Sequence, residues 1–242
     1  MINIVIPMAG EGRRFVEAGY KNPKPFIDVH GKPMIVRVLE NLKYRDARYI
    51  LIGRKEHLEQ ERDLVKSIKE AYPATFVSID QLTEGTVCTL LFARQYFNNK
   101  NPLLIANSDQ LVDLSIDSFI NDAMNRSLDG SILCFEEKNG DPKWSYAKIN
   151  EEGFVTEVRE KVVISNLATV GIYYFSKGNE FTEAAINMII KNERVNNEFY
   201  TCPVYNELLK QGSRIGTYCI NQASMHGLGT PNDLNLFLKH HE

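Results

Sequence analysis

Strand-like and helix-like segments alternate through the first half of the chain. Runs rich in β-branched and aliphatic residues predict strands at residues 2–7, 48–53, 75–79 and 103–106. Amphipathic windows between them predict helices at residues 33–43, 55–71 and 86–97. Strands joined in this way are usually parallel, because a parallel pair needs a long crossover connection that a helix can supply. The alternation therefore predicts an α/β fold with a mainly parallel sheet.

The second half carries more strand-like runs, which are separated by turn signals. Strands are predicted at residues 130–135, 146–149, 154–158 and 169–175, with turns at Asn139-Gly140-Asp141-Pro142 and Glu152-Gly153. Helices are predicted at residues 180–191, 198–210 and 231–238. The sequence contains no repeat and no linker rich in Pro, Gly or Ser. We therefore expect residues 1–242 to form a single domain around one mixed sheet.

Composition argues against several classes of partner. The chain has 28 basic and 31 acidic residues and a formal net charge of -3, which gives no strong field for a nucleic-acid backbone or an anionic membrane. No window approaches the roughly 18 uninterrupted apolar residues of a membrane span. The N-terminus lacks the basic region of a secretion signal. We expect a cytoplasmic protein that binds neither nucleic acid nor membrane.

The four cysteines lie far apart and form no Cys-x-x-Cys pair. They are Cys88, Cys134, Cys202 and Cys219. Isolated cysteines of this kind behave as small apolar residues in a reducing compartment, so we predict four free thiols.

A glycine loop directly follows the first predicted strand. It reads Pro7-Met8-Ala9-Gly10-Glu11-Gly12-Arg13-Arg14-Phe15, and Asn22-Pro23-Lys24-Pro25 follows shortly after. At the carboxyl end of a parallel strand, residues without Cβ let backbone N–H groups point together at an anion, while nearby Arg and Lys side chains bind separate phosphates. A tight strand-to-helix turn with two solvated arginines is the structural alternative. The position of the loop favours phosphate binding.

Two common nucleotide-binding loops do not fit these residues. A P-loop needs the pattern G-x-x-x-x-G-K-[ST], which is absent. The dinucleotide fingerprint needs a third glycine that opens a helix, and Phe15 stands at that position. Both readings are therefore excluded.

Three sequence blocks in the first 35 residues resemble the opening signature of the sugar-phosphate nucleotidyltransferases, the nucleotide-sugar pyrophosphorylase superfamily. The blocks are Gly10-x-Gly12-x-Arg14, Pro23-Lys24-Pro25-Phe26 and His30-Gly31-Lys32-Pro33-Met34-Ile35. Bacterial choline-phosphate cytidylyltransferases share this opening. The resemblance implies a Rossmann-like, GT-A-like three-layer sandwich, with helices on both faces of the sheet. It also implies transfer of a nucleoside monophosphate from a nucleoside triphosphate to a phosphomonoester such as a sugar 1-phosphate, with release of pyrophosphate.

The resemblance implies roles for the loop and for three catalytic residues. The loop would bind the triphosphate through Met8, Ala9, Gly10, Glu11, Gly12 and Arg13. Arg14 would bind the leaving phosphates, and Lys24 the α-phosphate or the acceptor. Asp109, in Asn107-Ser108-Asp109-Gln110, falls where the family binds Mg²⁺, a cation that prefers oxygen ligands. Outside the family context, an aspartate at a strand end is more often a turn or cap residue.

Further nucleotide contacts are implied after the third and fourth predicted strands. A base-reading segment corresponds to Gln81-x-x-x-Gly85-Thr86, because a carboxamide can donate to and accept from a base edge. A helix start capped by Thr83 is the alternative for this segment. Ser108 is assigned to nucleotide binding beside Asp109.

One late segment departs from the family pattern. Many relatives supply a second metal carboxylate from W-x-D-x-G-T, and the matching residues here are Met225-His226-Gly227-Leu228-Gly229-Thr230. Gly227 stands at the aspartate position, and imidazole from His226 is a poor ligand for Mg²⁺. Only Asp109 is therefore assigned to the metal.

Four residues of the second half are assigned to the acceptor by the same resemblance. They are Tyr146, Glu160, Lys161 and Gly171. Glycine in a central strand suits close approach of a ligand. A solvated charged pair is the structural alternative for Glu160 and Lys161, and a hydrophobic anchor under a loop is the alternative for the segment with Trp144 and Tyr146.

Several functions stay open at the level of sequence. The resemblance favours CTP as the donor, although no residue separates cytosine from uracil or thymine. The acceptor is a sugar 1-phosphate, or a non-sugar compound such as phosphocholine or a phosphorylated amino-acid derivative. A GT-A-type glycosyltransferase normally has an acidic-x-acidic motif where this chain has Ser108-Asp109-Gln110. A nucleotide-binding module without catalysis is the third class, and the oligomeric state, a homo-oligomer included, is open.

Overall fold

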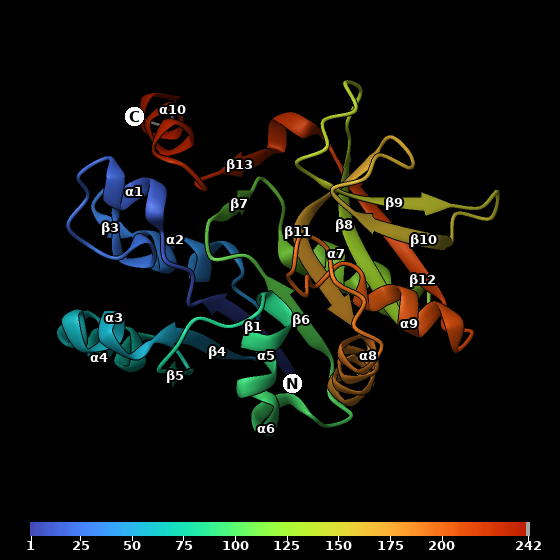
Figure 1. Ribbon diagram of the computed structural model, residues 1–242, viewed down its shortest axis with the longest axis horizontal. Helices are drawn as coiled ribbons and strands as arrows, with labels where there is room; N and C mark the ends of the chain where they lie inside the picture. Colours follow the sequence, from blue (N-terminus) through green and yellow to red (C-terminus); the bar gives the residue numbers. More distant parts are fainter. Residues whose placement is uncertain (241–242) are drawn as a thin grey trace.

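The computed structural model describes residues 1–240, in which nine strands form one mixed sheet (Figure 1). The strands of the first half are parallel: β1 (Ile2–Met8) lies between β4 (Ala47–Arg54) and β6 (Leu103–Ala106), and β5 (Ala74–Ile79) pairs with β4. This half agrees with the strands predicted from the sequence.

The second half adds antiparallel strands to the same sheet. The long strand β11 (Leu167–Phe175) pairs antiparallel with β6, and so joins the two halves. The remaining strands are β8 (Gly130–Glu136), β9 (Ser145–Ile149), β10 (Val155–Glu160) and β12 (Ile215–Ile220). Strand β12 pairs in parallel with β8 and was not predicted from the sequence.

Helices cover both faces of the sheet and create two buried cores. On β1, Ile4 and Ile6 belong to one core, whereas Val5 belongs to the other, because successive side chains point to opposite faces. The first core is completed by α2 (Met34–Asn41), α4 (Arg62–Ala71) and α7 (Ile116–Asn125). The second is completed by α5 (Thr86–Phe92), α6 (Arg94–Phe97), α8 (Gly178–Ile190) and α9 (Val204–Lys210). The result is a three-layer α/β sandwich.

Short elements bring distant parts of the chain to one end of the molecule. Strand β7 (Gln110–Val112) pairs with β13 (Met225–Gly227), and β2 (Asp28–Val29) pairs with β3 (Lys32–Pro33). The C-terminal helix α10 (Pro231–His240) lies beside the N-terminal region in Figure 1, and its Phe237 ring is 6.0 Å from that of His30. The remaining short helices are α1 (Arg13–Glu17), α3 (Lys55–Gln60), η1 (Lys24–Phe26) and η2 (Gln222–Ser224).

Three predicted helices need correction. The helix expected at 55–71 is interrupted at Glu61, and the one at 86–97 is interrupted at Ala93. The helix expected at 198–210 begins only at Val204, because the backbone of Phe199 bonds to Glu84 and Val87 instead of continuing a helix. Helix α7 was not predicted.

Two predictions from composition, the free thiols and the lack of a membrane span, can be compared with the structure. Cys88, Cys134, Cys202 and Cys219 are free. Within residues 1–240, no helix combines the length and the apolar character that a membrane crossing requires.

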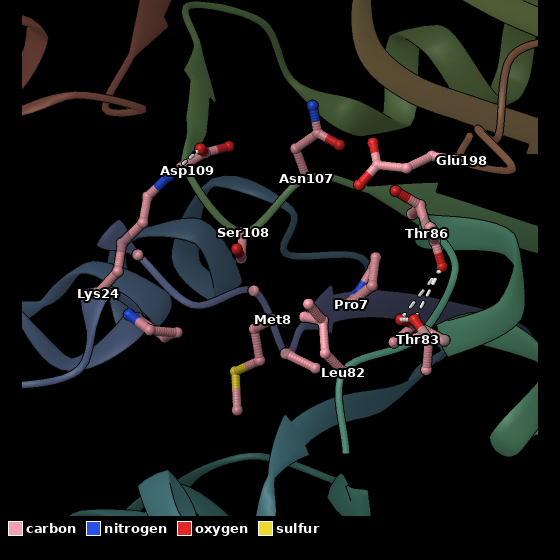
Figure 2. A pocket seen from close by; sticks show the side chains of 16 residues that line it. Pro7, Met8, Lys24, Leu82, Thr83, Thr86, Asn107, Ser108, Asp109 and Glu198 are labelled. Carbon is pink, nitrogen blue, oxygen red and sulfur yellow. Dashed lines mark hydrogen bonds and ion pairs between the residues drawn. The ribbon is translucent and has the colours of Figure 1, made fainter. Parts of the chain in front are cut away.

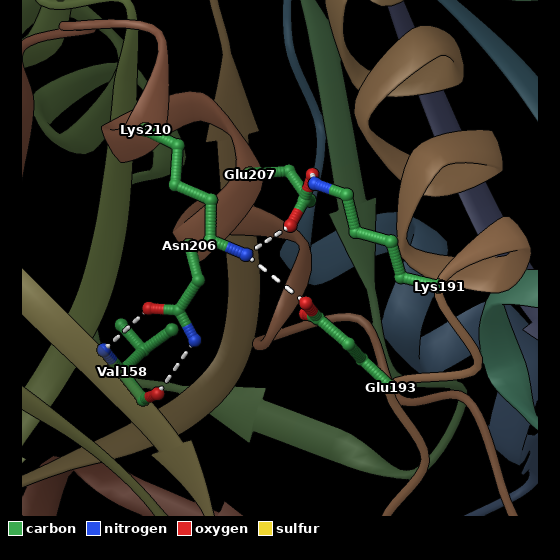
Figure 3. A network of polar contacts seen from close by, with 6 residues as sticks. All are labelled: Val158, Lys191, Glu193, Asn206, Glu207 and Lys210. Carbon is green, nitrogen blue, oxygen red and sulfur yellow. Dashed lines mark hydrogen bonds and ion pairs between the residues drawn. The ribbon is translucent and has the colours of Figure 1, made fainter.

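Helix α9 is fastened to the outer edge of the sheet by side chains (Figure 3). The amide of Asn206 accepts a hydrogen bond from the Val158 N–H at 3.0 Å and donates one to the Val158 carbonyl at 2.9 Å. It therefore occupies the position that a further strand would take beside β10. The next residue is Glu207, whose buried carboxylate accepts hydrogen bonds from Lys191 and Lys210 at 2.6 and 2.5 Å.

Replacing Asn206 should therefore weaken the fold measurably. We expect Asn206→Ala to lower the free energy of unfolding by about 1–3 kcal/mol, because both backbone groups of the buried Val158 lose their partners. Urea denaturation checks this, with Asn121→Ala on the exposed face of α7 as the matched control. Equal stability of the two variants would contradict the role assigned to Asn206.

Candidate active site

A cavity of about 360 Å³ opens where β1 and β6 end, at their carboxyl edge (Figure 2). Ligands of open α/β sheets usually bind at this edge. The cavity is lined by Pro7, Met8, Ala9, Gly10, Gly12, Lys24, Pro25, Leu82, Thr83, Gly85, Thr86, Thr89, Asn107, Ser108, Asp109 and Glu198.

The glycine loop forms one wall, and its conformation requires glycine at one position. Gly12 has a φ of 63°, in the left-handed region, and a Cβ added there would lie 3.1 Å from the Cβ of Lys24. The side chain of Phe15 turns into the core directly after the loop. Met8, Ala9 and Gly10 thus line the cavity while Phe15 anchors the loop in the core.

Lys24 and Asp109 form an ion pair in this cavity although they lie 85 residues apart in the sequence. The ammonium of Lys24 also donates to the Gly229 carbonyl at 3.3 Å and lies 5.6 Å from the centroid of the Phe15 ring. Both side chains are largely buried, with 19% and 25% of their surfaces exposed. The segments that contain Lys24, Asp109 and Gly229 therefore meet here and place one cation beside one carboxylate.

The opposite wall is built around Gly85, which has a φ of 116° and a ψ of 176°. A Cβ at Gly85 would lie 2.5 Å from the backbone nitrogen of Phe199, so only glycine permits these two segments to touch. The Thr83 hydroxyl donates to the Gly85 carbonyl at 3.0 Å and lies 2.6 Å from the Thr89 hydroxyl. These bonds hold Thr86 at the start of α5, facing the cavity.

Glu198 completes the cavity and is connected to Lys161. The Tyr200 hydroxyl donates to the Glu198 carboxylate and accepts a hydrogen bond from the Lys161 ammonium at 2.8 Å. Lys161 lies over the Tyr200 ring, 4.6 Å from its centroid. The predicted acceptor residue Lys161 therefore reaches the cavity wall indirectly, through Tyr200.

The structure gathers most of the predicted nucleotide residues in one place and separates others. The predicted residues that line the cavity are Met8, Ala9, Gly10, Gly12, Lys24, Gly85, Thr86, Ser108 and Asp109. Arg14 and Gln81 are exposed outside this lining, and Glu11 and Arg13 pair with each other at 2.6 Å. Gly171 lies behind Asn107, whose amide would be 2.2 Å from an added Cβ.

Tyr146 does not line an acceptor pocket, which corrects the prediction. Its side chain is fully buried, and its hydroxyl donates to the Asp141 carbonyl at 2.7 Å. Burial raises the pKa of this phenol to about 12. The neighbouring Trp144 packs edge-on against Phe135, with ring centroids 5.3 Å apart, so this segment is the hydrophobic anchor under a loop.

Glu160 is also withdrawn from the cavity. It is 7% exposed, and its carboxylate accepts a hydrogen bond from the Ser145 hydroxyl. Burial raises the pKa of this carboxyl, and the bond from Ser145 opposes the rise only in part. Glu160 thus supports the strand pair β9–β10 in this structure.

The late segment lies beside Asp109 without supplying a second carboxylate. The Leu228 N–H donates to the Asp109 carbonyl at 2.7 Å, and Gly227 pairs with Gln110. Asp233 is near, but its backbone N–H donates to the Thr230 hydroxyl and its carboxylate accepts from that hydroxyl at the start of α10. Within the described part of the chain, no group of three or more His, Cys, Asp or Glu side chains could hold a metal ion.

Sequence reasoning missed five polar residues of this site. They are Thr83 as a cavity residue, Thr89, Asn107, Glu198 and Tyr200. The pair Asn196-Asn197 was an available signal for a turn before Glu198, because asparagine tolerates positive φ. Both have positive φ, at 50° and 64°.

The contact at Gly85 predicts a large effect of adding one methyl group. Gly19 has a φ of 84° but no atom within 4 Å of a Cβ, so Gly19→Ala should cost only about 1–2 kcal/mol of backbone strain. Gly85→Ala should cost at least about 3 kcal/mol, because the backbone at Phe199 must also move. Thermal unfolding of both variants tests the difference, and equal losses would show that the contact is not tight.

The raised pKa of Glu160 predicts a pH-dependent stability. The folded state holds this proton more tightly than the unfolded state, so stability falls as pH rises from about 4.3, the ordinary pKa, to the raised value. Glu160→Gln removes that loss. Its melting temperature relative to wild type should therefore increase between about pH 4 and pH 7. Glu152→Gln, in an exposed turn, is the matched control, and a constant difference for Glu160→Gln would refute the assignment.

Comparisons with known proteins agree with the fold and with the motifs. A solved structure of a nucleoside-diphosphate-sugar pyrophosphorylase from Vibrio cholerae RC9 is 24% identical, covers 98% of this chain and 99% of that chain, and has a TM-score of 0.81. An inositol-1-phosphate CTP transferase from T. maritima is 12% identical over 99% of this chain and 96% of that chain, with a TM-score of 0.71. The Rossmann-like α/β fold predicted from the sequence is confirmed.

Curated relatives share part of the sequence. The mannose-1-phosphate guanylyltransferase catalytic subunit beta of Drosophila melanogaster is 24% identical over 176 residues, which are 71% of this chain and 47% of that protein. The chain thus spans about half the length of the curated relatives it matches. Residues 4–234 match the family model for nucleotidyl transferase. This match covers nearly the whole chain and confirms the resemblance seen in the opening motifs, so the protein belongs to the nucleotidyl transferase family.

Proposed function

We propose that this protein transfers a nucleoside monophosphate from a nucleoside triphosphate to a small phosphomonoester, such as a sugar 1-phosphate, and releases pyrophosphate. The meeting of Lys24 and Asp109 beside the glycine loop carries this proposal, because a cation and a metal-binding carboxylate at a phosphate-binding loop are what phosphoryl chemistry requires. The proposal includes a cytoplasmic location and leaves room for a homo-oligomer.

The reaction needs no strong general base. The second pKa of a phosphate monoester is about 6, so an acceptor oxygen is already anionic near neutral pH. That oxygen forms a bond to the α-phosphorus, and the bond from the α-phosphorus to the bridging oxygen breaks, so pyrophosphate leaves. Lys24 would stabilise the charge on the reacting phosphates, and Arg14 would bind the leaving pyrophosphate from the outer side of the loop.

Mg²⁺ is proposed as the cofactor because the cavity lacks positive charge. Its ionisable lining residues are Lys24, Asp109 and Glu198, one cation against two carboxylates. A bound triphosphate therefore needs further positive charge, which Mg²⁺ supplies when it is bound. Asp109 fits the ion as one carboxylate ligand, and phosphates and water commonly complete such sites. Gly227 offers no second carboxylate.

CTP is the donor we propose to test first. One solved structure with this fold is a CTP transferase for inositol 1-phosphate, and another is a nucleoside-diphosphate-sugar pyrophosphorylase. Pyrophosphate release should be measured with CTP, UTP, dTTP, ATP and GTP in turn, with Mg²⁺ and a mixed pool of phosphomonoesters. Pyrophosphate release with one donor and one acceptor supports the proposal. The absence of release with every pair would count against it.

Two substitutions should abolish most of the activity. Lys24→Ala and Asp109→Asn should each lower kcat/KM by about 10²- to 10³-fold, because the first removes a positive charge beside the reacting phosphates and the second removes the proposed carboxylate ligand of Mg²⁺. Lys100→Ala and Asp63→Asn carry the same chemical changes at exposed positions and should keep wild-type rates. Near wild-type turnover of Lys24→Ala or Asp109→Asn at saturating triphosphate and Mg²⁺ would overturn the assignment.

Removal of divalent metal should also stop the reaction. With excess EDTA we expect loss of pyrophosphate release and recovery on addition of Mg²⁺, because one lysine cannot neutralise a triphosphate. Undiminished release in EDTA would exclude the proposed cofactor. Intrinsic fluorescence of Trp144, recorded in parallel, checks that the fold is unchanged.

A further inference from the structure

Two cysteines occupy paired positions on neighbouring strands, and neither lines the candidate active site. Cys134 of β8 and Cys219 of β12 are partners in the register of this parallel strand pair. Neighbouring strands lie about 4.8 Å apart, and the Cα atoms of disulfide-bonded cysteines lie about 4.4–6.8 Å apart. The spacing of the backbone therefore permits a covalent bond between the two residues.

The side chains of the two cysteines point to the same face of the sheet. Successive residues of a strand face opposite sides, and Cys134 belongs to the second core whereas its neighbour Leu133 belongs to the first. On β12, Tyr218 and Ile220 pack against the first core, so Cys219 between them faces the side of the second. The two thiols are therefore neighbours on one face.

The two thiols differ in their access to solvent. Cys219 is exposed, whereas Cys134 is fully buried. Burial raises the pKa of the Cys134 thiol well above its usual value, and the neighbouring thiols of Cys219 and Cys202 add to this rise. A small oxidant can therefore reach Cys219, while Cys134 stays protonated behind it.

Thr217 supports the reactive form of the exposed thiol. Partial burial raises the pKa of the Cys219 thiol, and a hydrogen bond with the Thr217 side chain opposes this rise. Thr217 lies two residues before Cys219 on the same strand face, and its hydroxyl can donate to the sulfur. Because the thiolate is the form that reacts with oxidants, Cys219 is the residue of the pair that is oxidised first.

We infer that Cys219 and Cys134 form an oxidation site, at which hydrogen peroxide oxidises Cys219 and Cys134 then closes a disulfide between β12 and β8. The Cys219 thiolate attacks one peroxide oxygen, the O–O bond breaks, and a sulfenic acid and hydroxide form. The Cys134 sulfur then attacks the Cys219 sulfur, the S–O bond breaks, and the hydroxyl leaves as water with the Cys134 proton. Two thiols and one peroxide thus give one disulfide and two waters.

The disulfide formed at this site is easily reduced. Paired positions on parallel strands hold their Cβ atoms roughly one strand spacing apart, about 4.8 Å, whereas the Cβ atoms of a relaxed disulfide are about 3.8 Å apart. The bond must therefore draw β12 and β8 together, and a strained disulfide has a more oxidising potential than a relaxed one. Oxidation of the pair is thus reversible by a dithiol.

The test treats the full, reduced chain with hydrogen peroxide and measures its mass without reductant, so it needs no substrate and is independent of the proposed function. We expect the intact chain to lose two hydrogens, and digestion to give one linked pair of peptides that contains Cys134 and Cys219. Dithiothreitol should restore both thiols. Cys219→Ser should abolish the link, and Cys88→Ser, at a half-buried cysteine outside the pair, is the matched control that should keep it.

Cys134→Ala separates the two steps of the reaction. In this variant the sulfenic acid of Cys219 lacks its partner, so dimedone should trap it, whereas wild type should give little of this adduct. A Cys219 thiol that stays free after peroxide treatment would overturn the inference, as would a link from Cys134 to Cys202 or a link between two chains. Melting temperatures show which variants are folded, and the exposed substitution Cys219→Ser decides the matter even if Cys134→Ala unfolds.

Discussion

Strand β1 is buried on both faces, and the position of the cavity follows from this constraint. A central parallel strand is almost wholly apolar, so polar groups can gather only where it ends. The glycine loop begins there, and the neighbouring strand β6 ends on the same edge with Asn107, Ser108 and Asp109. The packing of the sheet therefore decides where polar groups of the cavity can meet.

The side of the cavity that contains Lys24 was predictable from the sequence because its signals are local. Gly10, Gly12 and Lys24 lie close together in the chain, and Asp109 follows a recognisable strand. The opposite wall was not predictable in the same way. Glu198 falls where a helix was expected, and its position depends on contacts with residues 84–87, more than a hundred positions earlier in the chain. Strands β12 and β13 are defined by their partners β8 and β7, and Tyr146 is buried by packing that no local pattern reveals.

The two walls of the cavity differ in how they are built and in what they can bind. The wall with Lys24 combines backbone groups and one cation, which suits phosphates. The wall with Asn107 and Glu198 instead presents an amide and a carboxylate, which are directional hydrogen-bonding groups. Lys161, which directly follows β10, reaches this wall through Tyr200, so the antiparallel half of the sheet also contributes to the cavity. The shortage of positive charge between the walls explains the proposed need for Mg²⁺.

The central claim is that an acceptor phosphate attacks the α-phosphorus of a nucleoside triphosphate in this cavity. The most direct measurement follows an acceptor whose three terminal phosphate oxygens are ¹⁸O, with ³¹P NMR and mass spectrometry of the products. The account predicts that all three labelled oxygens remain in the nucleotide product, one of them as the new bridge, and that the released pyrophosphate is unlabelled. Labelled inorganic phosphate, or a nucleotide product without ¹⁸O, would contradict it.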